Sequence, residues 1–137
     1  MTFLRPLLRC KTAATAVEFA ILAPIFFAMI FGIIEFSRYA WIHQTLNDVA
    51  YATARCMSVG TGCTSSTLQK TYAVNRAGGF GVTIAATNVT PVTNTTCKGY
   101  AASNSVTIRA NFHSPVEGLI PAMPTQLVSI ACFPVLA

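Results

Sequence analysis

Apolar residues form one unbroken run near the N-terminus and only short, periodic groups after it. From Phe19 to Ile34 the chain reads FAILAPIFFAMIFGII, without a charge or a strongly polar side chain. The small residues at 14–17 and the hydrophobic Phe36 extend this run to about the ~20 residues that a helix needs to cross a bilayer. The pattern therefore predicts a transmembrane helix over residues 14–36.

The helical period continues beyond the predicted membrane segment. Apolar or small side chains recur there at helical spacing, with polar residues on the other faces: Ile42, Leu46, Val49, Thr53 and Cys56/Met57. Gly60 and Gly62 supply a C-terminal stop. We expect a continuation of the helix over 37–58 and a total length of roughly 65 Å. Its stripe would pack on the chain's own C-terminal domain, with a helix from another subunit as the alternative.

Residues 59–137 are expected to form a small α+β domain with an antiparallel sheet. A short helix is predicted over 66–77, ended by Gly78 and Gly79, after which the period changes to two. Three strands are predicted from alternating or continuous apolar positions: Val82, Ile84 and Ala86; Val106, Ile108, Ala110 and Phe112; and Leu127–Phe133. Three strands carried on one long helix give an α+β fold, a helical stem with a small sheet.

Charge is scarce, and its distribution predicts the orientation of the chain. Only 9% of the residues are charged and 53% are apolar, which favours a membrane or fibre protein. Arg5, Arg9 and Lys11 precede the apolar run, and no basic face exists elsewhere, so a nucleic-acid partner is not expected. Cations on this flank place the N-terminus in the cytoplasm and export the C-terminal part, with Tyr39 and Trp41 at the headgroups.

A cleaved secretory signal peptide is the simpler alternative for the apolar run. Such a signal has an apolar core of about 7–15 residues, followed by small residues at the cleavage positions. Here the run is longer and ends in IIEFSRYAW, which offers no A-x-A-like site. We therefore expect the run to stay in the membrane.

Glu18 lies at the start of the apolar run and needs an explanation. A charge inside a membrane helix costs on the order of 2.5–3.5 kcal/mol at the centre and less near an end. One interpretation is that Glu18 lies at the headgroups, where its charge suits the helix dipole. This leaves unexplained why residues 12–16, TAATA, are all small.

The stretch A-A-T-A-V-E-F before an apolar helix resembles the class III signal of type IV pilins and pseudopilins. The resemblance implies that a prepilin peptidase cuts between Ala13 and Ala14 and removes the leader 1–13. Glu18 then becomes the fifth residue of the mature chain. Its carboxylate can pair with the new amino group on Ala14 of a neighbouring subunit, which fixes an axial register because an unpaired charge in lipid is costly.

A closer resemblance is to the TadE-like family of the tight-adherence (Flp, type IVc) pilus system. It rests on V-E-F-A, on Pro24, on G-I-I-E-F-S-R at 32–38, on Q-x-L-x-x-A/V-x-x-x-A at 44–54, and on the Arg-Cys pair at 55–56. It implies a minor pilin (pseudopilin) in the bacterial inner membrane with a periplasmic domain, which is also incorporated in the extracellular pilus. Its partners would be the prepilin peptidase, other pilin subunits and pilus assembly proteins.

Five cysteines are many for this chain length. Cys10 precedes the membrane run, and the other four fall on the exported side, where an even number suggests disulfides. Of the three possible pairings we favour Cys56–Cys63, which closes a short loop after the helix, with Cys97–Cys132, which ties the central loop to the last strand. A zinc site is the alternative, although no C-x-x-C is present.

Catalytic motifs are not found in the sequence. His43 and His113 belong to no H-E-x-x-H array, and no G-x-S-x-G or phosphate-binding glycine loop occurs. Glu117 is the one acid after Asp48, so the C-terminal part has no carboxylate pair for acid–base catalysis. We expect no enzyme, catalytic residue, metal or cofactor. The alternative function is a single-span inner-membrane protein whose periplasmic domain binds a ligand or partner.

Overall fold

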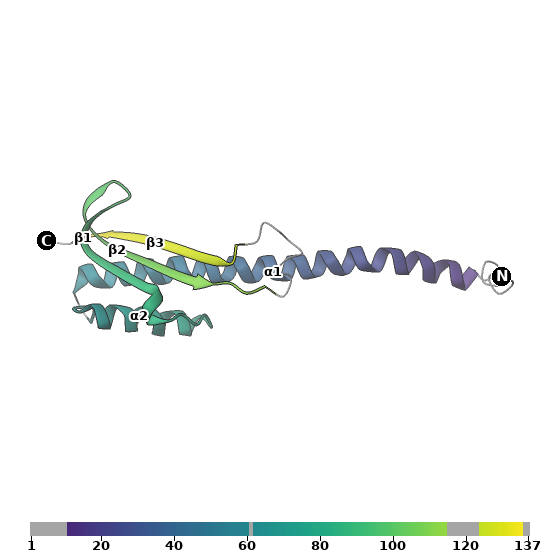
Figure 1. The fold of residues 1–137 in the computed structure, drawn as a ribbon, viewed down its shortest axis with the longest axis horizontal. Coiled ribbons are helices and arrows are strands. Elements are labelled where there is room, and N and C mark those ends of the chain that lie inside the picture. Colours follow the sequence, from purple (N-terminus) through teal and green to yellow (C-terminus); the bar gives the residue numbers. More distant parts are fainter. Residues whose placement is uncertain (1–10, 61, 115–123, 136–137) are drawn as a thin grey trace. The chain divides into compact units, whose positions relative to one another are not determined.

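The computed structural model describes residues 11–60, 62–114 and 124–135. The chain divides into two units, residues 1–38 and 39–137. The fold is α+β as predicted, with one long N-terminal helix and a small antiparallel sheet (Figure 1). The elements in chain order are α1 (Lys11–Val59), α2 (Ser66–Gly79), the 3-10 helix η2 (Ala86–Asn88), β1 (Val89–Cys97), β2 (Tyr100–Asn111) and β3 (Gln126–Pro134).

Helix α1 confirms the predicted long helix and begins three residues before Ala14, at Lys11. It ends where the two glycines predict a stop. Gly60 has a φ of +76°, a left-handed conformation that glycine adopts without a steric penalty. Its N–H donates to the carbonyl oxygen of Cys56 at 3.1 Å, which satisfies one of the last free carbonyls of the helix.

Helix α2 begins at Ser66 as predicted and includes Gly78 and Gly79, the two residues that were expected to end it. The Ser65 side chain accepts a hydrogen bond from the Leu68 N–H at 3.3 Å, a typical N-cap arrangement. At the other end Gly81 has a φ of +75°, and the Val82 N–H donates back to the Ala77 carbonyl oxygen at 3.0 Å. The chain turns there because Gly81 permits a conformation that the helix cannot continue through.

The sheet has the order β1-β2-β3, with both pairs antiparallel. β2 and β3 keep a regular register from Ser103↔Pro134 to Asn111↔Gln126. β1 and β2 are joined at Lys98 and Gly99, whose φ angles of +49° and +88° are those of the tight turns that match the twist of a hairpin.

One predicted strand is wrong: residues 82–86 form an extended connection and not a strand. Val82 and Ile84 are buried as the alternation indicates, but Ala86 begins the short helix η2. The strand that pairs with β2 is the Thr/Asn-rich segment after it, Val89–Cys97. Alternation reports which side chains are buried, whereas strand pairing also needs a partner in register.

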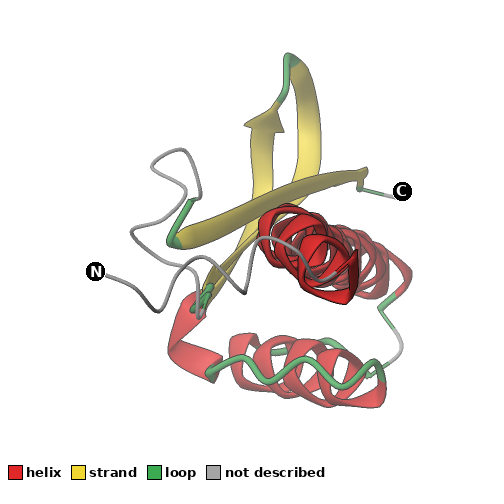
Figure 2. Ribbon diagram, turned by 90° about the vertical axis from the view of Figure 1, so that its right-hand side faces the viewer, coloured by secondary structure: helices red, strands yellow, loops and turns green. Residues whose placement is uncertain are grey.

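The hydrophobic core lies in the second unit, between the 39–59 segment of α1, α2 and the sheet. Figures 1 and 2 show the sheet and α2 on different sides of this segment. The predicted stripe of α1 faces these elements, with Leu46, Val49 and Thr53 fully buried. The core cluster consists of small and medium side chains: Leu46, Val49, Ala50, Ala54, Ala73, Ala77, Val82, Ile84, Val89, Val106, Ile108, Ala110, Phe112 and Leu127.

Candidate membrane anchor and assembly site

The N-terminal part of α1 exposes an almost purely apolar surface. Its most apolar 18-residue stretch has a mean hydropathy of 2.4, and none of that stretch is buried. By length and composition this helix can cross a membrane, where lipid would cover side chains that water would not tolerate as one patch. The exposed residues are Val17, Phe19, Ile21, Leu22, Ile25, Phe26, Phe27, Met29, Ile30, Phe31, Ile33, Ile34 and Phe36.

Glu18 is exposed on this apolar surface. Within the part of the chain that the structure describes, its carboxylate makes no ion pair or hydrogen bond. In lipid such a group needs a partner from outside the helix, because an isolated charge there is costly. Ala13 and Ala14 also lie within α1, and the remainder of the predicted leader, residues 1–10 with Cys10, lies outside the described residues.

The C-terminal end of the apolar run carries an ion pair. Arg38 and Glu35 lie one turn apart, with Nη1 and Oε1 separated by 3.5 Å. Between these two residues, the Ser37 hydroxyl donates to the Ile33 carbonyl oxygen at 2.8 Å, so that its polar group is satisfied by the helix backbone. The first charges after the run are therefore compensated at the place where the helix leaves the predicted span.

Two features of the apolar segment affect how it packs. Pro24 lies inside α1, where it cannot donate the usual backbone hydrogen bond. A Cβ added at Gly32 would meet nothing within 4 Å, so the surface at Gly32 is open among the described residues. Gly32 forms a small-x-x-x-small pair with Ala28, an arrangement that permits close approach of a second helix.

The four cysteines after the apolar run form two disulfides, the same two pairs that the sequence favours. Cys56–Cys63 closes the loop between α1 and α2, and Cys97–Cys132 joins β1 to β3. The Gln69 side chain adds a hydrogen bond from α2 to the Cys63 carbonyl oxygen at 2.9 Å. Each bridge thus connects two elements of the second unit that would otherwise depend on a small core.

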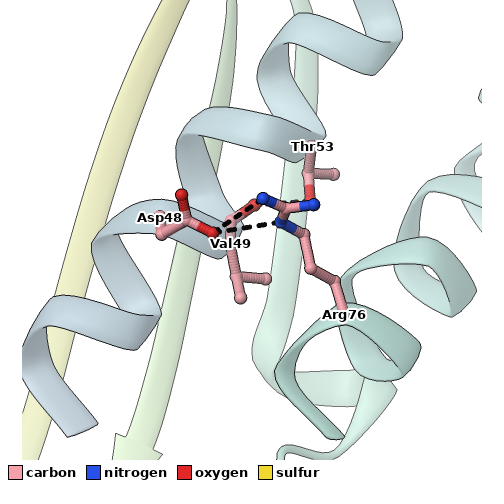
Figure 3. Close-up of polar contacts among 4 residues, drawn as sticks. All are labelled: Asp48, Val49, Thr53 and Arg76. Carbon is pink, nitrogen blue, oxygen red and sulfur yellow. Dashed lines mark hydrogen bonds and ion pairs between the residues drawn. The ribbon is translucent and has the colours of Figure 1, made fainter. Parts of the chain in front are cut away.

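An ion pair attaches α2 to α1. Figure 3 shows the Arg76 guanidinium directed at Asp48, with Nε and Nη2 donating to the same carboxylate oxygen at 3.1 and 2.9 Å. The buried Thr53 hydroxyl donates to the Val49 carbonyl oxygen at 2.7 Å and so brings no unsatisfied group into the core.

Polar side chains also connect α1 to the sheet. The Ser129 hydroxyl donates to Asn47 Oδ1 at 2.6 Å, and Asn104 Nδ2 donates to the Ser58 hydroxyl at 2.9 Å. Because Asn47 and Ser58 lie eleven residues apart on α1, these bonds fix the sheet along three turns of the helix. A one-residue slip of β2 or β3 would break them.

Sequence reasoning missed these polar contacts. Asp48 was detectable as a rare acid beside the buried stripe, and Arg76 as a cation in the last turn of a predicted helix. Nothing in the sequence relates the two, because 28 residues separate them. The contacts of Asn47 and Asn104 depend on strand register in the same way, which no local pattern indicates.

Two of the grooves bordered by described residues of the second unit hold no catalytic arrangement. The larger, of about 620 Å³, is bordered by Asn47, Tyr51, Lys98, Tyr100 and Ile130, among others. The smaller, of about 420 Å³, follows the α1–α2 seam at Asp48, Arg55, Tyr72 and Arg76. Among the described residues, no three His, Cys, Asp or Glu side chains lie together in a way that could hold a metal ion. His43 instead stacks on Tyr39.

The exposed apolar helix and the small disulfide-bonded sheet unit define the class of a membrane-anchored α+β protein. Comparison with protein families refines this class. The family model described as TadE-like protein matches residues 13–55, so the resemblance to the TadE-like family is confirmed over α1 from the predicted cleavage site onward. The family is a structural one associated with tight-adherence pilus systems. No curated protein and no solved structure matches the chain significantly.

Proposed function

We propose that this protein is a minor pilin (pseudopilin) of a tight-adherence pilus machine. It enters the inner membrane with its N-terminus in the cytoplasm and residues 59–137 in the periplasm. Residues 14–36 span the membrane, and 37–58 continue the helix into the periplasmic domain. A prepilin peptidase removes residues 1–13, and the mature protein then helps to initiate or assemble the pilus used for surface attachment.

The observation that carries the proposal is an exposed glutamate on an otherwise apolar helix, within the segment that matches the TadE-like family. Glu18 has no partner among the described residues, and cleavage after Ala13 creates a positive α-amino group on Ala14. That amine lies four residues, or ~6 Å of helix rise, from the carboxylate. When the carboxylate of one subunit pairs with the amine of its neighbour, neither charge faces lipid without a partner. Because only one axial register allows this pairing, the helices assemble in that register.

The first experiment determines the mature N-terminus. Intact mass and N-terminal sequence are measured on the membrane-extracted protein, made with and without the prepilin peptidase. The proposal predicts a chain that begins at Ala14 only when the peptidase is present. A chain that still begins at Met1 in both samples would refute the cleavage step.

The second experiment tests the role of Glu18. Glu18→Gln is expected to leave cleavage intact and to abolish recovery of the protein with sheared pili, because the charge that sets the register is lost. Glu35→Gln is the matched control, since that acid lies on the same helix but already has Arg38 as its partner. Equal recovery of Glu18→Gln and the unmodified protein would contradict the register role.

The groove of about 620 Å³ favours a second candidate, a single-span protein whose periplasmic domain binds a ligand or partner. Tyr51, Tyr100 and Ile130 give this groove aromatic and aliphatic borders, and Lys98 adds a charge. This function needs neither cleavage nor Glu18. An uncut chain that tolerates Glu18→Gln would therefore support it over the pilin.

A further inference from the structure

The fold brings two exposed aromatic residues to one end of the second unit. Trp41 lies on α1 and Phe80 follows α2, 39 residues later. The indole Nε1–H of Trp41 donates to the Phe80 carbonyl oxygen at 3.3 Å. Both side chains are nevertheless large and open to the surroundings, with 59% of Trp41 and 41% of Phe80 exposed.

This end of the unit contains the residues that directly follow the predicted membrane span in the sequence. α2 returns antiparallel to the 39–59 segment of α1, so that its last turn comes back beside the first turns of that segment (Figure 1). Trp41 is five residues from Phe36, the last residue of the apolar run. Five residues of α-helix rise ~7.5 Å, and even a fully extended link of that length reaches at most ~18 Å.

The chemistry of the two aromatic residues suits the lipid headgroup region. That region is about 5–7 Å thick on each side of a ~30 Å hydrocarbon layer, so the helical link of ~7.5 Å puts the Trp41 backbone at its outer edge, where the indole ring can contact the headgroups. Indole and phenyl rings that present an apolar body beside a polar edge concentrate at this interface. Because the Trp41 N–H already has a partner in the protein, its ring enters the interface without leaving a donor unsatisfied.

The charges around the two rings favour the same environment. The Arg76 guanidinium lies 5.9 Å from the centre of the Phe80 ring, and its carboxylate partner Asp48 is the one acid in residues 39–60 and 76–82. No unpaired carboxylate in these segments would repel the anionic lipids of a bilayer surface.

We infer that Trp41 and the Phe80-Gly81 turn form a membrane-resting surface of the second unit, which contacts the phospholipid headgroups. The partner is the bilayer interface, recognised by apolar aromatic area and by the Arg76 guanidinium beside the Phe80 ring. Gly81 matters because its positive φ turns the chain directly after Phe80, and this leaves the ring at the outer end of α2. The inference concerns the membrane-bound protein and does not depend on its cleavage or on a pilus.

The experiment moves the chain's one tryptophan to position 80. The full-length double variant Trp41→Phe/Phe80→Trp is reconstituted in vesicles of phosphatidylethanolamine and phosphatidylglycerol, with spin-labelled lipids that quench either at the headgroup or deep in the acyl chains. The matched control, Trp41→Phe/Tyr100→Trp, puts the indole in the exposed β1–β2 turn. Native disulfides and unchanged far-UV circular dichroism establish that both variants are folded.

The membrane-resting surface predicts that the tryptophan at position 80 loses most of its emission to headgroup-labelled lipid and little to deep-labelled lipid. The tryptophan at position 100 should remain unquenched by either lipid and accessible to acrylamide. A tryptophan at position 80 that behaves like the control would overturn the inference. So would one shielded from acrylamide but not quenched by lipid, because another protein surface would then cover it.

A second variant tests the same surface without moving the reporter. Phe80→Asp in the otherwise unmodified chain puts a carboxylate beside Trp41 and removes the apolar ring. The emission maximum of Trp41 in vesicles is then expected to shift to longer wavelength, whereas Tyr100→Asp should leave it unchanged. An unchanged maximum in Phe80→Asp would also overturn the inference. Purified protein suffices for both measurements, so their failure is distinct from failure of the pilin proposal.

Discussion

The two disulfides allow a prediction in which loop length is the main variable. Cys97 and Cys132 are 35 residues apart, whereas Cys56 and Cys63 are 7 residues apart. In the chain-entropy model, removing the first bridge lowers the free energy of unfolding by about 3.8 kcal/mol and removing the second by about 2.4 kcal/mol. We expect the longer bridge to contribute more by about 1.4 kcal/mol.

The two cysteine pairs are buried to similar extents, so the effects of removing each bridge can be compared directly. Each pair contains one buried cysteine, Cys63 or Cys97, and one half-buried cysteine, Cys56 or Cys132. The double variants Cys56→Ala/Cys63→Ala and Cys97→Ala/Cys132→Ala therefore remove similar packing along with each bridge. What differs between them is the length of the loop that the unfolded chain can explore.

The assay is equilibrium unfolding of the full-length protein in detergent micelles with guanidinium chloride, without reductant. Far-UV circular dichroism follows the second unit, while the apolar helix in the micelle contributes a constant signal. The longer bridge should shift the unfolding midpoint further, with an unchanged slope in denaturant. Equal shifts, or a larger shift for Cys56→Ala/Cys63→Ala, would refute the loop-length reasoning.

Two smaller perturbations test the core and the helix–helix attachment in the same assay. Leu46→Ala removes a fully buried core side chain and is expected to lower the free energy of unfolding by about 2–5 kcal/mol. The control Leu68→Ala changes a side chain that is 47% exposed and should lower it far less. Equal effects of the two variants would contradict the assigned core. Asp48→Asn breaks the partly exposed ion pair with Arg76 and is expected to cost about 0.2–1 kcal/mol, less at high salt. A larger cost, or one independent of salt, would mean that Asp48 has a role other than screened charge pairing.

The N-terminal half of the molecule was readable from the sequence because its determinants are local. A continuous apolar run, a stop at Gly60 and a short second helix that begins at Ser66 each depend on neighbouring residues. The burial of Leu46 and Val49 also followed from helical period alone. The same holds for the alternation in β2, where Val106 and Ile108 face the core.

The position of the first strand was not readable in this way. The Val82–Ile84 alternation correctly indicates burial, but these residues cover the core as an extended connection. β1 is richer in threonine and asparagine, and it becomes a strand because the tight turn at Lys98 and Gly99 folds it back onto β2. The valines and threonines of β1 favour a strand, and pairing with β2 decides where that strand begins and ends.

The sequence by itself determined the apolar helix, the α+β class and the position of Glu18 at the start of the apolar run. Only the tertiary structure decided which distant residues meet: Asp48 with Arg76, and Trp41 with Phe80. The physical reason is the separation along the chain over which each interaction acts. Helix period, capping and hydrophobic burial act over a few residues and are visible in the order of side chains. Contacts between elements depend on the register in which helices and strands pack, which is set by the whole core at once.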